Sequence, residues 1–121
     1  HGHDHVWLGE LAPREQASDV ARSMAVLDAV GIRDRPFTYS YPYGSFDSNT
    51  IGLMRDIGCA AAVTTRVAIA DLASDGLLEL PRLDTNDLPA DAAAPNEWTR
   101  VALRAGHSSS HSTTTYEATA E

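Results

Sequence analysis

The first five residues hold the densest group of possible metal ligands in the chain. Three imidazoles and a carboxylate stand in the pentapeptide His1-Gly2-His3-Asp4-His5, and the apolar segment Val6-Trp7-Leu8 follows it. Imidazole nitrogens bind divalent metals such as zinc at about 2.0–2.1 Å. On one helical turn, His1 and His5 would project from the same face and could converge on one ion, while His3 would point elsewhere. The spacing therefore indicates a candidate two-histidine metal site.

Other readings of these histidines stay open. A terminal histidine cluster can also be solvated, or can be left from a purification tag. His107 and His111 have the same spacing but lie in the Ser/Thr-rich tract 106–115. Metal ligands need a scaffold and a second shell of hydrogen bonds that orients each ring, and a flexible tract supplies neither. We therefore do not expect the second pair to bind a metal.

A second candidate feature is the turn Tyr39-Ser40-Tyr41-Pro42-Tyr43-Gly44. Its Pro and Gly follow an aromatic-rich segment that reads as a strand, so the turn could hold backbone N–H groups toward a cleft. Such groups stabilise an oxyanion, and α/β proteins place their active sites at the carboxyl ends of strands. A tight turn with aromatic packing and no catalytic part is the alternative.

The elements that would position these groups alternate between helix and strand. Apolar residues at a helical period predict a helix over 13–30, with Pro13 in its first turn and Gly31 in the left-handed position beyond its end. A strand is predicted at 35–41, a helix capped by Asp47 or Ser48 and ending at Asp56, and strands at 60–64 and 77–83. This order is typical of a parallel α/β layer or barrel. Residues 1–88 form the expected domain, and 89–121 an Ala/Pro-rich then Ser/Thr/His-rich tail expected to be disordered.

Composition excludes several functions. The net charge is −8, and the nine basic residues are single arginines, so nucleic acid is not an expected partner. No apolar run approaches the roughly 20 residues that cross a bilayer, so membrane insertion is not expected. Cys59 is the single cysteine, which excludes an internal disulfide and a thiolate zinc cluster and suggests an inert core thiol. The sequence leaves localisation open.

The ordered set of motifs resembles the NodB-homology, or polysaccharide deacetylase, family. The opening pentapeptide resembles the family's second motif, in which both outer histidines bind the catalytic metal, and 40–44 resembles its third motif in the Tyr-Pro-Tyr-Gly form. Segments 58–66 and 80–84 resemble later strands in order and spacing. The resemblance covers about residues 1–88 and implies part of a distorted β/α barrel.

By this resemblance, the protein is a metal-dependent hydrolase that removes acetyl groups from N- or O-acetylated sugar or polysaccharide. His1 and His5 would hold a divalent metal, with zinc the first candidate. The Tyr43 backbone N–H would stabilise the oxyanion. Substrate would contact Trp7, Tyr41 and Pro42, although the aromatic residues could equally be core.

Two departures from the family pattern limit this implication. The first family motif, a Thr-Phe-Asp-Asp stretch that supplies the base and the third ligand, is absent from the chain, and Ser40 stands where the third motif often has Arg. Asp4 and Asp47 are not at the matching place. We therefore expect the chain alone to be inactive, to require the N-terminal half of its domain, and to be marginally stable or self-associating. Two alternatives remain: a non-catalytic, degenerate domain that at most binds carbohydrate or metal, and a structural fragment with a fortuitous chelator.

Overall fold

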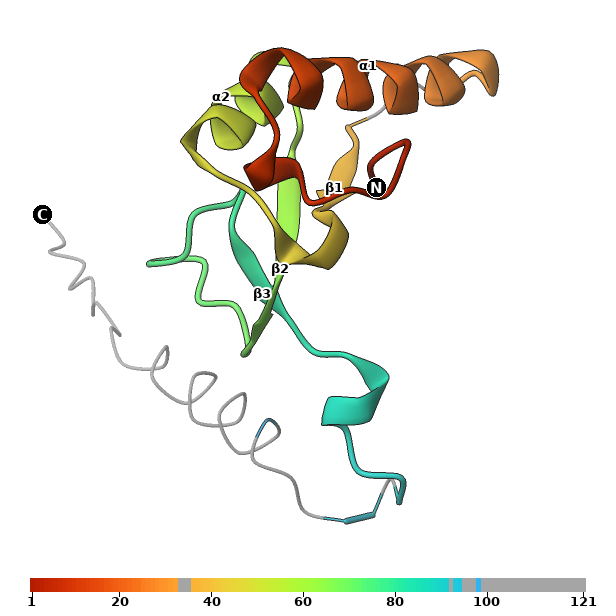
Figure 1. Ribbon diagram of the computed structural model, residues 1–121. Helices are drawn as coiled ribbons and strands as arrows, with labels where there is room; N and C mark the ends of the chain where they lie inside the picture. The colour runs from red at the N-terminus through yellow and green to blue at the C-terminus, as the bar shows by residue number, and fades with distance from the viewer. Residues whose placement is uncertain (33–35, 92, 95–97, 99–121) are drawn as a thin grey trace, which may run out of the picture. The chain divides into compact units, whose positions relative to one another are not determined.

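The computed structural model of the protein describes residues 1–32, 36–91, 93–94 and 98 (Figure 1). One compact unit extends from His1 to Asp87, and a second begins at Leu88. The histidines at 107 and 111, and the predicted disordered tract around them, lie outside the described residues. No helix in the described ranges has both the length and the apolar character needed to cross a membrane.

Helix α1 (Pro13–Ala29) confirms the first predicted helix. Pro13 begins it, and Gly31 (φ 71°) ends it with its N–H donating to Asp28 O at 3.0 Å, which satisfies a carbonyl of the last turn. The predicted apolar face is only partly packed, because Val20 is buried whereas Val30 is 62% exposed.

Helix α2 (Ser48–Asp56) begins at the predicted cap, and α1 and α2 lie next to each other (Figure 1). Asp47 is the N-cap residue, and its carboxylate accepts from the Thr50 N–H at 2.8 Å. The buried Gln16 side chain of α1 joins the helices, since its Oε1 accepts from Thr50 Oγ1 at 2.8 Å and its Nε2 donates to Asp47 Oδ1 at 3.3 Å. Buried polar groups are therefore paired at this junction.

The strands form one small parallel sheet in the order β1-β2-β3, with β1 at Thr38–Ser40, β2 at Ala61–Val67 and β3 at Leu80–Arg82. This confirms the α/β class. Within the described residues the sheet has three strands and is open, so it is not by itself a barrel. The pairing of β1 with β2 is regular, whereas β2 and β3 shift register between Val63 and Val67. Short 3₁₀ turns lie at Leu8–Glu10 (η1), Pro42–Gly44 (η2) and Thr85–Asp87 (η3).

The core lies between the two helices and the sheet. Its buried apolar residues come from η1, α1, α2 and the strand region: Leu8, Val20, Tyr39, Tyr41, Met54, Cys59 and Ala62. Cys59 is buried, as predicted, and burial raises the pKa of its thiol. A buried thiol with a raised pKa is a poor nucleophile and metal ligand, which agrees with a packing role.

The α2 cap makes stability depend on acid pH. The Thr50 backbone N–H, above all, lowers the pKa of Asp47 from 3.8 to about 2. A depressed folded-state pKa contributes stability above the unfolded value, and this contribution is lost as pH falls toward the folded value. The urea midpoint is therefore expected to fall more steeply between about pH 4 and pH 2 in the wild type than in Asp47→Asn, whose amide can cap without titrating. Parallel pH profiles of the two proteins would contradict this.

Candidate functional site around His1, His5 and Tyr43

The two outer histidines of the opening pentapeptide lie side by side. Their ring centroids are 4.7 Å apart, with the rings tilted by 48°. The prediction that they share a helical turn is wrong, because residues 1–7 contain no helix and His5 adopts a left-handed φ of 53°. A folded loop below α1 (Figure 1), which contacts α1 through Asp19 and β1 through Ser40, brings the rings together.

Each of these imidazoles uses its Nδ1 atom in a contact with the other side of the site. His1 Nδ1 lies 2.6 Å from Ser40 O, so it carries the proton and donates to that carbonyl. His5 Nδ1 lies 3.1 Å from the Tyr43 hydroxyl. Metal-binding histidines are commonly oriented in this way through the ring nitrogen that does not bind the metal. The arrangement leaves the two Nε2 atoms as the candidate ligands, and this donor chemistry fits a divalent cation.

The other two polar residues of the pentapeptide face α1. Asp4 forms an ion pair with Arg22, and His3 Nε2 lies 3.9 Å from Asp4 Oδ1. Neither residue joins the rings of His1 and His5. In the described part of the chain no cluster of three or more His, Cys, Asp or Glu side chains is placed to hold a metal. Among the residues that the structure describes, the site therefore presents two imidazoles and no third ligand.

The turn η2 follows β1 at its carboxyl end and stands against the His5 ring. Tyr43 (φ 57°) and Gly44 (φ 68°) both adopt left-handed backbone. The Gly44 N–H donates to Tyr41 O at 2.9 Å, whereas the Tyr43 N–H has no acceptor among the described residues. The Tyr43 side chain contacts the His5 ring, so this turn lies beside the histidines, and its free backbone donor is a candidate for stabilising a developing negative charge.

The aromatic residues predicted to contact substrate divide into two groups. Trp7 and Tyr43 stack face to face with centroids 4.8 Å apart, and each is about half exposed. Tyr41 is instead 1% exposed, stacks on Phe46 and donates its hydroxyl to Leu78 O at 2.9 Å. Pro42 is also buried. The burial of Tyr41 and Pro42 favours the alternative that these two residues belong to the core, whereas Trp7 is accessible; substrate contact by the three residues stays a prediction.

A polar depression of about 500 Å³ adjoins Gly44. Its lining includes an ion pair, in which Arg66 Nη2 lies 2.5 Å from Asp75 Oδ1, and the carboxylate of Glu79. The backbone N–H of Asp71, followed by Arg66, lowers the pKa of Asp75. Sequence reasoning missed this surface, because Arg66 and Asp75 belong to a strand end and a loop whose pairing no periodicity encodes.

Comparison with known proteins places these residues in context. The polysaccharide deacetylase family matches residues 1–62, a stretch that holds the pentapeptide and η2. The structure of the Streptococcus pyogenes deacetylase PplD in complex with acetate is similar, with a TM-score of 0.58 and 28% sequence identity. That similarity covers 65% of this chain and 34% of the S. pyogenes chain, so this chain spans about a third of its length. No curated protein matches the chain.

Proposed function

Because this chain belongs to the polysaccharide deacetylase family, we propose that it is part of a hydrolase that removes acetyl groups from N- or O-acetylated carbohydrate. One observation carries the proposal. The rings of His1 and His5 lie 4.7 Å apart, next to the exposed Tyr43 turn at the carboxyl end of β1. Two imidazoles that could hold a divalent cation, beside a turn that could offer a backbone donor, would supply two of the parts used in metal-assisted hydrolysis of an acyl group.

We propose that His1 and His5 hold a divalent cation, with zinc the first candidate, through their Nε2 atoms. When bound, such an ion lowers the pKa of a water from about 15.7 to about 7 and polarises a carbonyl. The Ser40 carbonyl fixes the His1 tautomer with the proton on Nδ1, and the Tyr43 hydroxyl restrains the His5 ring. Imidazole also suits other divalent metals, so titration with zinc, manganese and cobalt would compare their affinities.

The turn and the aromatic pair would serve the acetyl group and the sugar. The Tyr43 N–H would donate to the carbonyl oxygen as negative charge develops on it, an interaction worth on the order of 10²–10³ in rate at comparable sites. The stacked rings of Trp7 and Tyr43 would offer flat apolar surface to a sugar, and the depression beside Gly44 would take polar groups of a longer substrate.

The remaining parts of the machinery would come from outside this chain. The sequence contains no Thr-Phe-Asp-Asp stretch, so we propose that the base and a further ligand belong to the N-terminal half of the same domain. The three-stranded sheet would then be one part of a β/α barrel. Alone, the chain would release no acetate, and its open sheet edges would favour association with another copy.

Acetate release tests this function directly. A form extended upstream of His1 by the residues that its gene encodes there is incubated with an N-acetylated and an O-acetylated oligosaccharide. We expect metal-dependent acetate release from one of them, lost in His1→Ala and in His5→Ala. Arg14→Gln, a change at an exposed residue of α1, is the matched control and should leave the rate unchanged. An extended chain that folds, binds metal and releases no acetate would support a non-catalytic domain instead.

A further inference from the structure

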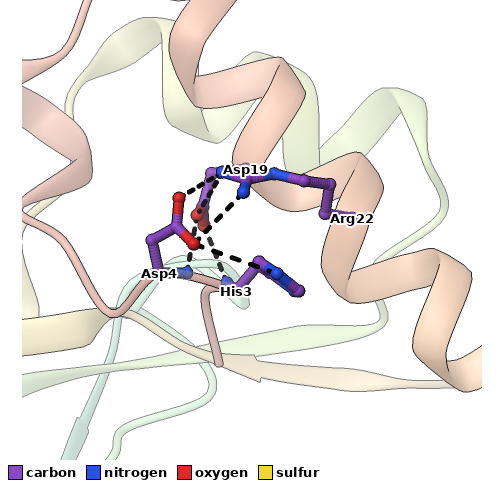
Figure 2. Close-up of polar contacts among 4 residues, drawn as sticks. All are labelled: His3, Asp4, Asp19 and Arg22. Atoms are coloured by element: carbon purple, nitrogen blue, oxygen red, sulfur yellow. Dashed lines mark hydrogen bonds and ion pairs between the residues drawn. The ribbon is translucent and has the colours of Figure 1, made fainter.

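Asp19 is a buried carboxylate that the proposed mechanism does not use. It lies on α1 and is 2% exposed, and its side chain points into the loop that carries the histidines (Figure 2). Oδ2 accepts from the His3 N–H at 2.9 Å and Oδ1 accepts from the Asp4 N–H at 2.8 Å. Two consecutive backbone donors of the pentapeptide therefore converge on one carboxylate, one on each oxygen.

Burial of this charge needs an explanation, because a buried carboxylate is strongly unfavourable unless it is paired and hydrogen-bonded. The two backbone hydrogen bonds are charge-assisted, a class roughly twice as strong as neutral ones. Arg22, one turn further along α1, adds a guanidinium nitrogen 3.5 Å from Asp19 Oδ1 and also forms the ion pair with Asp4 (Figure 2). The loop is thus attached to α1 through Asp19 itself and through its neighbour.

The loop approaches this carboxylate so closely that only glycine fits between them. A Cβ atom added at Gly2 would lie 2.7 Å from Asp19 Oδ2 and 3.2 Å from Pro42 Cγ. On the other side of the contact, His5 adopts a left-handed φ of 53°. A non-glycine residue keeps such a conformation only when its surroundings determine it. The hydrogen bonds to Asp19 restrain the two residues that directly precede His5.

We propose that Asp19 is the positioning residue of the metal site. It fixes the backbone of His3 and Asp4, and so sets the directions in which His1 and His5 present their rings. This inference rests on the proposed function, since it assumes that these two rings are ligands. Asp19 acts on the backbone between the ligands, whereas Ser40 and Tyr43 act on the rings themselves.

Arg22 contributes less than Asp19 to holding the loop. Its side chain is 47% exposed, and exposed ion pairs contribute little because water and salt screen them. Asp19 is desolvated, so removal of its charge leaves two backbone donors facing an amide that can accept only one of them well. Replacement of Asp19 therefore removes a buried positioning contact, whereas replacement of Arg22 removes a surface ion pair on the same helix.

The test compares Asp19→Asn with Asp56→Asn, the same change at an exposed aspartate on α2. Zinc affinity is measured by calorimetry, and backbone hydrogen exchange is measured residue by residue. In Asp19→Asn we expect zinc affinity to fall by about 10- to 100-fold, the usual cost of losing an outer-shell partner. The amides of His3 and Asp4 should exchange faster while those of β2 stay protected. Asp56→Asn and Arg22→Gln should stay within a few-fold of wild type.

A second variant and the exchange of two amides test the role of Asp19 further. If Asp19→Asn does not fold, Gly2→Ala disturbs the same contact from the loop side and should weaken zinc binding similarly. Unchanged zinc affinity in a folded Asp19→Asn protein overturns the inference, as does fast exchange of the His3 and Asp4 amides in the wild type. If the wild type binds no zinc, the metal site of the proposed function fails. Slow exchange of those amides, lost in Asp19→Asn, would still establish that Asp19 holds the loop.

Discussion

Zinc affinity is expected to fall by more than about 100-fold when either His1 or His5 is replaced by alanine, whereas His3→Ala should keep it within a few-fold. The rings of His1 and His5 lie 4.7 Å apart with their Nδ1 atoms engaged by Ser40 and Tyr43. Each therefore supplies one of the two candidate ligand atoms that the described residues place at this site. Loss of a residue that hydrogen-bonds to a ligand lowers metal affinity by roughly 10- to 100-fold, so loss of a ligand itself should lower it further.

The measurement is calorimetric titration of the chain with zinc, manganese and cobalt. The amino terminus is acetylated, because a free α-amine beside the imidazole of His1 could itself bind metal. His3→Ala is the matched control, since the His3 ring faces Asp4 rather than the other two rings. Equal loss in all three variants would show that the pentapeptide is an unspecific surface chelator, and the metal site would then be abandoned.

Local signals allowed most of the fold to be predicted. Pro13 and Gly31 bound α1, and Asp47 and Gly58 bound α2, because capping and left-handed positions depend on neighbouring residues alone. The class followed from the order of the elements. Strand ends were less accurate, since β1 has three residues where seven were predicted. A parallel strand ends where its partner ends, and that partner is distant in sequence.

The site could be predicted in its residues but not in its geometry. Spacing in the pentapeptide suggested a helical turn, whereas the loop is held by Asp19, Ser40 and Tyr43, which are between 15 and 39 positions away. Such contacts join residues that are distant in sequence, whereas periodicity describes only residues that are close in sequence. Tyr41 and Tyr43 illustrate the same limit: both are tyrosines of one turn, yet Tyr41 is buried and Tyr43 is half exposed. Metal binding and substrate contact stay predictions.

The second large effect is expected at Gly44, where alanine should lower the free energy of unfolding by about 2–5 kcal/mol. Two costs add. The left-handed φ of 68° disfavours any residue with a Cβ atom, by about 1–2 kcal/mol. That Cβ atom would also lie 2.1 Å from Thr65 Oγ1 and 2.9 Å from Thr65 Cβ, so η2 and β2 would have to separate, which typically costs about 1–3 kcal/mol. Urea unfolding measures the sum.

Gly58→Ala separates the two costs. Gly58 also has a left-handed φ, of 77°, but apart from its chain neighbours no described residue has an atom within 4 Å of the position its Cβ would take, so only the backbone cost of about 1–2 kcal/mol applies. The difference in unfolding free energy between the two variants then measures the steric contact with Thr65. In a Thr65→Gly background, Gly44→Ala should lose this steric part of its destabilisation. Because Tyr43 precedes Gly44 in the turn, separation of η2 from β2 would also disturb the contact of the Tyr43 hydroxyl with His5 Nδ1. Equal destabilisation by Gly44→Ala and Gly58→Ala would mean that Thr65 does not support the turn.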